Sequence, residues 1–239
     1  MPTSINKLER LKRINLHGNR INYYEELCKL VGLDSLEHLG LRYNDFKYLP
    51  PCISNLKTLR SIDVSQNYSF RLSANIALLS TLPELESLDI GNRDGRLPSN
   101  IIQLKNLKSL DLSYTRNLDL KRACRILSNM NVQHLSLSNC SLDEVPSNIQ
   151  LLCKLKSLYL GDNYISTLPK NIESLSQLEY LDLGGNKNLK ELPAEIYLLK
   201  KLKTLNLYGI ELTSNQLLEL KLNLPNCEII SVPYQTMIH

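Results

Sequence analysis

The sequence predicts an α/β solenoid in which short parallel strands follow one another in an open sheet and short helices or turns return on its other side. Three observations predict it: a leucine motif that recurs along almost the whole chain, paired leucines two residues apart in each copy, and a proline-containing motif between copies. One copy is too short to bury its apolar face alone, so neighbouring copies must stack around a continuous core.

The leucine motif is clearest at residues 155–163, which read Leu-Lys-Ser-Leu-Tyr-Leu-Gly-Asp-Asn, and it recurs at residues 178–186. Leu158 and Leu160 are two residues apart, so both side chains point to one face of a strand. Nine copies begin 22 to 26 residues apart, at Leu11, Leu36, Leu59, Leu85, Leu107, Val132, Leu155, Leu178 and Leu202. The sequence therefore predicts one domain over residues 1–239 with about nine strands.

A buried asparagine is expected at the turn that leaves each strand, because its amide group can bond to backbone groups that the turn leaves unpaired. Five copies keep it, at Asn19, Asn44, Asn67, Asn163 and Asn186. Thr115 and Cys140 take its place in two others, whereas Arg93 and Ile210 depart from the pattern. We therefore expect irregular turns after the fourth and ninth strands.

The second motif, Leu-Pro-x-x-Ile-x-x-Leu, stands between strands at residues 49–56 and 97–104. Its Leu-Pro or Val-Pro step returns at residues 145–146, 168–169 and 192–193. Together the two motifs resemble the leucine-rich-repeat superfamily, and the second is similar to the intracellular scaffold-type repeats of the Ras-suppressor and scribble families and of plant immune receptors. The resemblance implies a right-handed horseshoe with the parallel β-sheet on the concave face and short helices and turns on the convex face.

Helices are expected on the convex side at roughly residues 22–31, 72–82, 119–128 and 213–222. Thr213 or Ser214 is the expected N-cap of the last one. Repeats with Leu-Pro are expected to carry a turn or one short helical turn, because Pro fits only the beginning of a helix. Residues 213–239 are expected to close the stack as a C-terminal capping segment, with one more strand within residues 224–232.

The N-terminal residues 2–11 lie in register with residues 50–59, so the chain begins inside a repeat. Two interpretations stay open. The chain is the C-terminal part of a longer repeat protein, or Ile5 and Leu8 cover a natural start. The first interpretation keeps open that the chain is the recognition arm of a larger multidomain enzyme or receptor.

The charge balance argues against a nucleic-acid partner. The chain has 28 Lys and Arg against 24 Asp and Glu, a net charge of +4, and no long basic run; binders of polyanions usually show a clustered basic excess. No stretch approaches the roughly 18 uninterrupted apolar residues of a membrane-spanning helix, so no membrane insertion is expected. The pattern does not indicate an oligomeric state.

Six cysteines are scattered at wide spacing without a CxxC pair: Cys28, Cys52, Cys124, Cys140, Cys153 and Cys227. We interpret them as small buried hydrophobic residues that stay reduced, and we disfavour a disulfide or a zinc site. Reduced thiols and the lack of an apolar signal-peptide core predict a cytoplasmic location. A truncated N-terminus would leave a secreted or surface-attached protein possible.

The candidate binding residues are those expected to point outward between and beside the paired leucines, onto the concave face. The basic zone comprises Arg13, His17, His38 and Arg42. The acidic zone comprises Asp63, Asp89 and Asp111. The tyrosine zone comprises Tyr159, Tyr180, Asp182 and Tyr208, and Tyr43 and Tyr114 are expected near strand ends.

These zones predict a module that binds a protein or peptide ligand. Tyr brings a large rigid ring and a hydroxyl, and it is enriched where binding energy concentrates. The tyrosine zone would hold the ligand, and the acidic zone would steer a basic segment toward it. For the three aspartates alone we prefer a structural interpretation, in which they keep a parallel sheet from exposing flat apolar surface.

No catalytic centre, cofactor or metal site is expected. His17 and His38 could approach Asp63, but an open sheet excludes little water and offers no convergent pocket. The sequence has no Gly-rich phosphate loop, HExxH or GxSxG motif. A carbohydrate or glycoconjugate is the alternative ligand class, although Trp, which is prominent in such sites, is absent.

Overall fold

The computed structural model describes residues 1–19, 23–91 and 95–231. Ten three-residue strands occur there, and each of the nine predicted strands begins two residues after its motif start. The strands are β1 (Arg13–Asn15), β2 (His38–Gly40), β3 (Ser61–Asp63), β4 (Ser87–Asp89), β5 (Ser109–Asp111), β6 (His134–Ser136), β7 (Ser157–Tyr159), β8 (Tyr180–Asp182), β9 (Thr204–Asn206) and β10 (Glu228–Ile230). The predicted extra strand within residues 224–232 is confirmed as β10.

The chain forms two compact units. The first comprises residues 1–93, 97–111 and 129–131, and the second comprises residues 94–96, 112–128 and 132–239. Within the first unit β1 to β5 pair in parallel and in sequence order. Within the second, β6 to β10 do the same. The predicted α/β solenoid is thereby confirmed in each unit.

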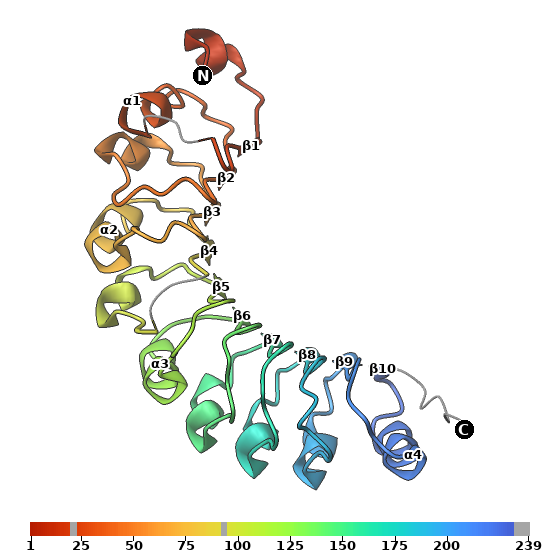
Figure 1. Ribbon diagram of the computed structural model, residues 1–239. Helices are drawn as coiled ribbons and strands as arrows, with labels where there is room; N and C mark the ends of the chain where they lie inside the picture. The colour runs from red at the N-terminus through yellow and green to blue at the C-terminus, as the bar shows by residue number, and fades with distance from the viewer. Residues whose placement is uncertain (20–22, 92–94, 232–239) are drawn as a thin grey trace, which may run out of the picture. The chain divides into compact units, whose positions relative to one another are not determined.

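The core is a ladder of leucines and isoleucines, because the middle residue of each strand from β2 to β9 is buried and its two neighbours are half-exposed. The middle side chains are at most 2% exposed: Leu39, Ile62, Leu88, Leu110, Leu135, Leu158, Leu181 and Leu205. Burying each of them contributes about 1.5 to 3 kcal/mol relative to an exposed position. The first and third residues of the strands form the open face, which no helix of the described chain covers (Figure 1).

The four predicted helices are confirmed on the other side of each unit (Figure 1). They are α1 (Tyr23–Cys28), α2 (Leu72–Leu79), α3 (Leu120–Leu127) and α4 (Ser214–Asn223). Thr213 caps α4 through a capping box: its hydroxyl accepts from the Gln216 N–H, and its own N–H donates to the Gln216 side chain. The segment predicted to close the stack thus contains α4 and β10, which pairs with β9, and its residues 232–239 lie outside the described part.

The Leu-Pro repeats carry a single 3-10 turn, as expected. The turns are η2 (Pro51–Asn55), η3 (Ser99–Gln103), η4 (Ser147–Leu152), η5 (Lys170–Ser174) and η6 (Ala194–Leu198), and η1 (Thr3–Lys7) has the same form. A proline in extended conformation precedes each turn. Proline needs no N–H at that place, so the helical turn begins directly after it.

The predicted asparagine ladder is confirmed at the four buried positions Asn44, Asn67, Asn163 and Asn186. Asn163 shows the pattern. Its Oδ1 accepts from the N–H groups of Cys140 and Leu142 at 2.9 and 3.0 Å, and its Nδ2 donates to the carbonyls of Leu137 and Leu160 at 2.9 Å each. Its Nδ2 also lies 3.2 Å from the Gly161 carbonyl, so one side chain pairs five backbone groups of two neighbouring repeats.

The ladder is weaker at its outer and substituted positions. Asn19 is exposed in the first repeat. Within the described chain the buried Thr115 hydroxyl has no hydrogen-bond partner. Arg93 lies outside the described residues. Ile210 is buried, and its N–H donates to the Leu207 carbonyl as the equivalent groups do after β5 and β8, so the irregular turn predicted after β9 was wrong.

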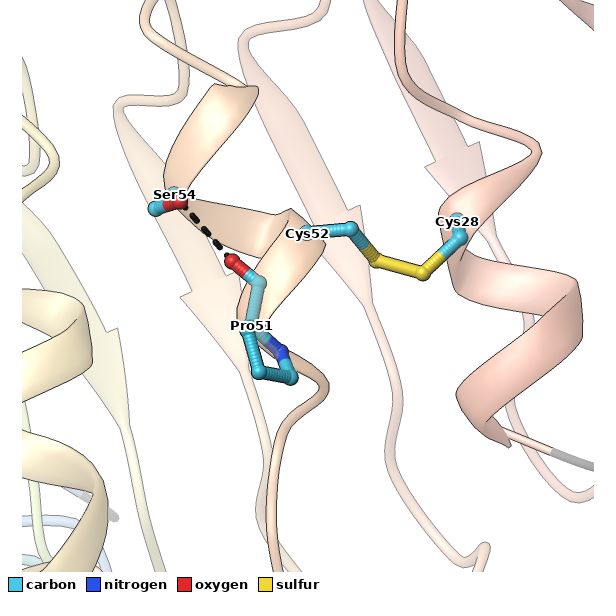
Figure 2. Close-up of a disulfide and its surroundings, with 4 residues drawn as sticks. All are labelled: Cys28, Pro51, Cys52 and Ser54. Atoms are coloured by element: carbon cyan, nitrogen blue, oxygen red, sulfur yellow. Dashed lines mark hydrogen bonds between the residues drawn. A yellow bond between two sulfur atoms is a disulfide. The ribbon is translucent and has the colours of Figure 1, made fainter.

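The interpretation of the cysteines as reduced was wrong at Cys28 and Cys52, and full burial holds only at Cys124 and Cys140. A disulfide joins Cys28 at the end of α1 to Cys52 in η2 (Figure 2). The two residues are 24 apart, which is one repeat, so stacking places them side by side on the helical side of the first unit. Of the four free cysteines, Cys124 and Cys140 are buried as expected, whereas Cys153 is exposed.

We predict that removing this cross-link destabilises the first unit. A disulfide that closes a loop of this length contributes about 3 kcal/mol by restricting the unfolded chain. Alkylation in denaturant without reductant should label four thiols rather than six, as counted by mass spectrometry. Urea unfolding should show a loss of that size for Cys28→Ala/Cys52→Ala but not for Cys153→Ala, and six labelled thiols would contradict the cross-link.

We also predict that substitutions at Asn163 and Thr115, which hold equivalent repeat positions, change the free energy of unfolding by unequal amounts. Asn163→Ala removes the side chain that bonds to five backbone groups. An unpaired buried group costs about 1 to 3 kcal/mol, so we expect a loss of about 3 kcal/mol or more. Thr115→Val removes a hydroxyl that bonds to nothing and should change the free energy of unfolding by less than about 1 kcal/mol. Urea unfolding monitored by circular dichroism measures both, and equal losses would show that the amide bonds do not support the turn.

Candidate functional site

The basic zone predicted in the first two repeats is less basic than its sequence suggests. His17 lies beyond β1, and its Nε2 is 3.4 Å from Oδ2 of Asp63, two strands away. It reaches across Gly40, where an added Cβ would lie 2.4 Å from that nitrogen. The predicted approach of His17 to Asp63 is confirmed, and it joins the basic and acidic zones within the first unit.

The other basic residues contact near neighbours. Arg13 and His38 are register partners on β1 and β2. The pKa of His38 is lowered, first by burial and then by the Arg13 charge. The Arg42 guanidinium carbon lies 4.8 Å from the centroid of the Tyr43 ring, within the range of a cation–π contact.

The acidic zone lies on the third residues of β3, β4 and β5, where adjacent strands bring Asp63, Asp89 and Asp111 side by side in the first unit. Burial, followed by the charges of Asp63 and Asp111, raises the pKa of Asp89 to about 7. The Gly91 N–H donates to Asp89 Oδ1 at 3.0 Å, and this hydrogen bond lowers the pKa of Asp89. The middle carboxyl therefore titrates near neutral pH and gives this row less negative charge than three ionised aspartates would.

The tyrosine zone brings three predicted residues together in the second unit. The rings of Tyr159 on β7 and Tyr180 on β8 lie 4.9 Å apart between centroids, at 38° to each other. Asp182 ends β8 and is the register partner of Tyr159. Its Oδ1 accepts from the Gly184 N–H at 2.9 Å and from Asn206 Nδ2 at 2.8 Å. Burial is the main cause of its raised pKa.

Three predicted tyrosines lie apart from this cluster. Tyr208 follows β9 and is 63% exposed, and its described polar contacts are made by its backbone: its N–H donates to Asn206 Oδ1, and its carbonyl accepts from the Gly185 N–H. Tyr43 and Tyr114 follow β2 and β5, and both adopt a positive φ, 57° and 63°. Both side chains are exposed, but they belong to different units. The structure therefore provides one tyrosine pair rather than a continuous aromatic surface.

A row of alternating charges at the strand entrances was missed in the sequence. The residue just after the first leucine of each motif is Lys12, Glu37, Arg60, Glu86 and Lys108 in the first unit. Lys12 Nζ lies 2.9 Å from Glu37, and Lys108 Nζ lies 2.6 Å from Glu86. In the second unit Lys203 pairs with Glu179 at 2.6 Å. Aligning the copies at the leucine would have revealed the alternation, since residues one repeat apart become neighbours.

The remaining chemistry gives no organised catalytic or metal site within the described residues. No group of three His, Cys, Asp or Glu side chains there could hold a metal ion. His134 Nδ1 lies 3.0 Å from Ser157 Oγ on the open face, without a carboxylate bonded to the ring. Burial raises the pKa of Cys124 to about 12 and that of Cys227 to about 11, so neither forms a ready thiolate.

Two surface hollows lie away from every predicted binding residue. One, of about 400 Å³, is lined by residues 79–85 and 103–106 in the first unit. The other, of about 520 Å³, is lined by residues 116–121 and 140–146 in the second. No aromatic residue lines either hollow, so the open face, which carries the tyrosine pair, remains the candidate site. Among the described helices none is both long and apolar enough to cross a membrane.

We predict that the first unit loses stability as the pH rises from about 4 to about 7. The folded pKa of Asp89 is about 7 and its ordinary value is 3.8, so the folded state holds a proton that the unfolded state releases. Asp89→Asn should remove this dependence and stabilise the chain at pH 8 more than at pH 4. Urea unfolding at both pH values measures it, with the exposed Asp34→Asn as the charge-matched control. Parallel behaviour of the two variants would contradict the prediction.

Curated relatives match this chain over only part of their own length. Rattus norvegicus volume-regulated anion channel subunit LRRC8D is 31% identical over 72% of this chain and 20% of the relative. Mus musculus podocan is 30% identical over 81% of this chain and 32% of the relative. A Schizosaccharomyces pombe adenylate cyclase is 28% identical over 92% of this chain and 14% of the relative. The chain thus spans about a third or less of each of these proteins.

Solved structures share the fold. A Leptospira interrogans leucine-rich-repeat protein is 29% identical with a TM-score of 0.64, covering 95% of this chain and 62% of that one. Internalin C2 of Listeria monocytogenes is 18% identical with a TM-score of 0.64. The match covers 88% of this chain and 93% of the internalin and supports the fold alone. Residues 130–187 and 153–217 match the Leucine rich repeat family profile. Repeat, fold and relatives agree that the chain belongs to the leucine-rich-repeat superfamily.

Proposed function

We propose that this chain is a non-catalytic module that binds a protein partner on the open face of its sheet, with Tyr159, Tyr180 and Asp182 at the centre of the contact. The observation that carries the proposal is the tilted, half-exposed pair of tyrosine rings in contact beside a half-buried carboxylate. Repeat solenoids present extended surfaces of this kind to their partners. Tyrosine concentrates binding energy because it offers rigid apolar area and a hydroxyl.

The neighbourhood of the pair supports this assignment. In the described chain neither tyrosine hydroxyl has a hydrogen-bond partner, and the flanking open-face residues Ser157 and Thr204 are small. The rings are therefore held by each other and by the sheet and not by a polar network. A rigid, partly exposed ring pair loses little conformational entropy when a partner covers it.

A recognition role within a larger protein is the second candidate. It is favoured by the partial coverage of the relatives, one of which is an adenylate cyclase. Carbohydrate binding, the other alternative, has in its favour the aromatic rings beside Asp182. Both alternatives use the same open face, so one surface experiment addresses all three.

The proposed location needs revision together with the cysteines. The cytoplasmic expectation rested partly on six reduced thiols, and the Cys28–Cys52 cross-link removes that support. Disulfides persist in oxidising compartments and are rare in the cytosol. We therefore propose that the chain matures in an oxidising compartment, and the thiol count described for the cross-link tests this in protein taken directly from its source.

We predict that a photo-cross-linking amino acid at Thr204 captures a protein partner, because Thr204 is the register partner of Tyr180 on the open face. The same probe at Leu198, which is 54% exposed in η6 on the other side, should not. Tyr159→Ala/Tyr180→Ala/Asp182→Ala should abolish capture at Thr204 while the circular dichroism unfolding curve keeps its shape.

The outcomes are separable. Capture from Leu198 alone would move the site to the helical side. Capture at Thr204 that survives the triple substitution would keep the open face but reject the tyrosine pair. A captured species that a glycosidase degrades and a protease does not would favour the carbohydrate alternative, and no capture at either position would contradict the proposal.

A further inference from the structure

Asp182 is a carboxylate that lacks a cation. It is half-buried, and both groups that donate to its Oδ1 are neutral: the Gly184 N–H and Asn206 Nδ2. It takes part in no ion pair among the described residues, whereas Glu179 at the entrance of the same strand is paired with Lys203. Partial burial removes water from an anion, and a fixed cation would restore that lost stabilisation.

Two residues beside the carboxylate are glycines, so neither has a side chain that covers it. Gly161 and Gly184 flank Asp182 on the open face, and a Cβ added to them would lie 3.2 Å from Oδ2 and 3.3 Å from Oδ1. A larger residue at either position would crowd the carboxylate. The exposed Asp162 adds a second negative charge nearby and has no cationic partner among the described residues.

The tyrosine rings select the shape of the cation. Tyr159 is the register partner of Asp182, and Tyr180 lies two residues before it on the same face of β8. A guanidinium is planar, stacks on aromatic rings and donates through a fork that matches a carboxylate, whereas an ammonium is a compact and strongly hydrated charge. Within the chain both kinds of cation lie over tyrosine rings, Arg42 over Tyr43 at 4.8 Å and Lys47 over Tyr48 at 5.7 Å. The choice of a guanidinium at Asp182 therefore rests on its planar fork, which can stack on a ring and bond to a carboxylate together.

We propose that Tyr159, Tyr180 and Asp182 form a receptor for an arginine side chain of the protein partner. The guanidinium lies against the tyrosine rings, and its N–H groups donate to the Asp182 carboxylate, chiefly to Oδ2. This inference rests on the proposed function and specifies the chemistry of its central contact. It separates Asp182 from Asp63, whose carboxylate already meets His17 within the chain.

Asp89 provides the matched control. It holds the same strand position in the first unit, and its Oδ1 accepts from Gly91 N–H as that of Asp182 accepts from Gly184 N–H. Its neighbours across the strands are Asp63 and Asp111, and the first residues of β3, β4 and β5 are serines. A carboxylate in the same backbone setting but without tyrosines should not bind arginine in the same way.

The test is an NMR titration of the full chain with N-acetyl-arginine methylamide, alongside the matching lysine and citrulline compounds. We expect the arginine probe to shift the Gly184 amide and the Asn206 side-chain amide, with at least about fivefold weaker binding of the lysine probe and none of the neutral citrulline. Asp182→Asn and Tyr180→Ala should each weaken binding by about tenfold, the equivalent of about 1.4 kcal/mol. Asp89→Asn should not change it, and circular dichroism checks that each variant is folded.

Three results would overturn the inference. Equal binding of the lysine probe would reject a guanidinium receptor, and equal weakening by Asp89→Asn would reject its location. No shift with any probe, together with capture at Thr204 that the triple substitution abolishes, would reject the arginine contact and leave the proposed function standing. No shift and no capture would reject both.

Discussion

The buried asparagine at the turn after β2, β3, β7 and β8 is the interaction on which the rest of the structure depends. A strand of three residues cannot hold its own register, and the turn that follows it leaves backbone groups that water does not reach. In the second unit Asn163 and Asn186 pair these groups across neighbouring repeats, as Asn44 and Asn67 do in the first. The leucine core provides the driving force, but leucines alone would tolerate slippage; the amide bonds require equivalent residues of neighbouring repeats to lie side by side.

Because neighbouring repeats are held in strict register, residues that are far apart in the sequence lie close together in space. Residues one repeat apart become neighbours, whether they lie on the open face, at the strand entrances or on the helical side. Three contacts follow from this one rule: the Tyr159–Tyr180 ring contact, the Lys12–Glu37 ion pair and the Cys28–Cys52 disulfide. The binding surface therefore needs no separate scaffold, because the same register that builds the core also sets the neighbours on the open face.

The sequence predicts the elements well because their signals are local. Paired leucines two residues apart locate each strand, Pro before Ile locates each 3-10 turn, and Thr213 with Gln216 marks the start of α4. The predictions that failed concern contacts between repeats. Cys28 and Cys52 look unpaired when read along the chain. The approach of His17 to Asp63 was predicted, but its dependence on Gly40, which has no side chain between them, was not. The raised pKa of Asp89 likewise depends on carboxylates of two neighbouring strands and on burial, neither of which a single motif reveals.

Asp89 and Asp182 show how one repeat position acquires two roles. Both end a strand and accept from the N–H two residues later, so the backbone treats them alike. Their surroundings differ: Asp89 lies between two further carboxylates, which favour its neutral form, whereas Asp182 lies between Tyr159 and Asn206. At Asp89, protonation of the carboxyl removes the repulsion from the neighbouring carboxylates, and no group from outside the chain is needed. The second site is relieved best by a positive group brought from outside, and the tyrosine rings next to it decide which positive group fits. The repeat thus supplies an equivalent carboxylate in both units, and the residues on adjacent strands determine whether it serves the fold or a partner.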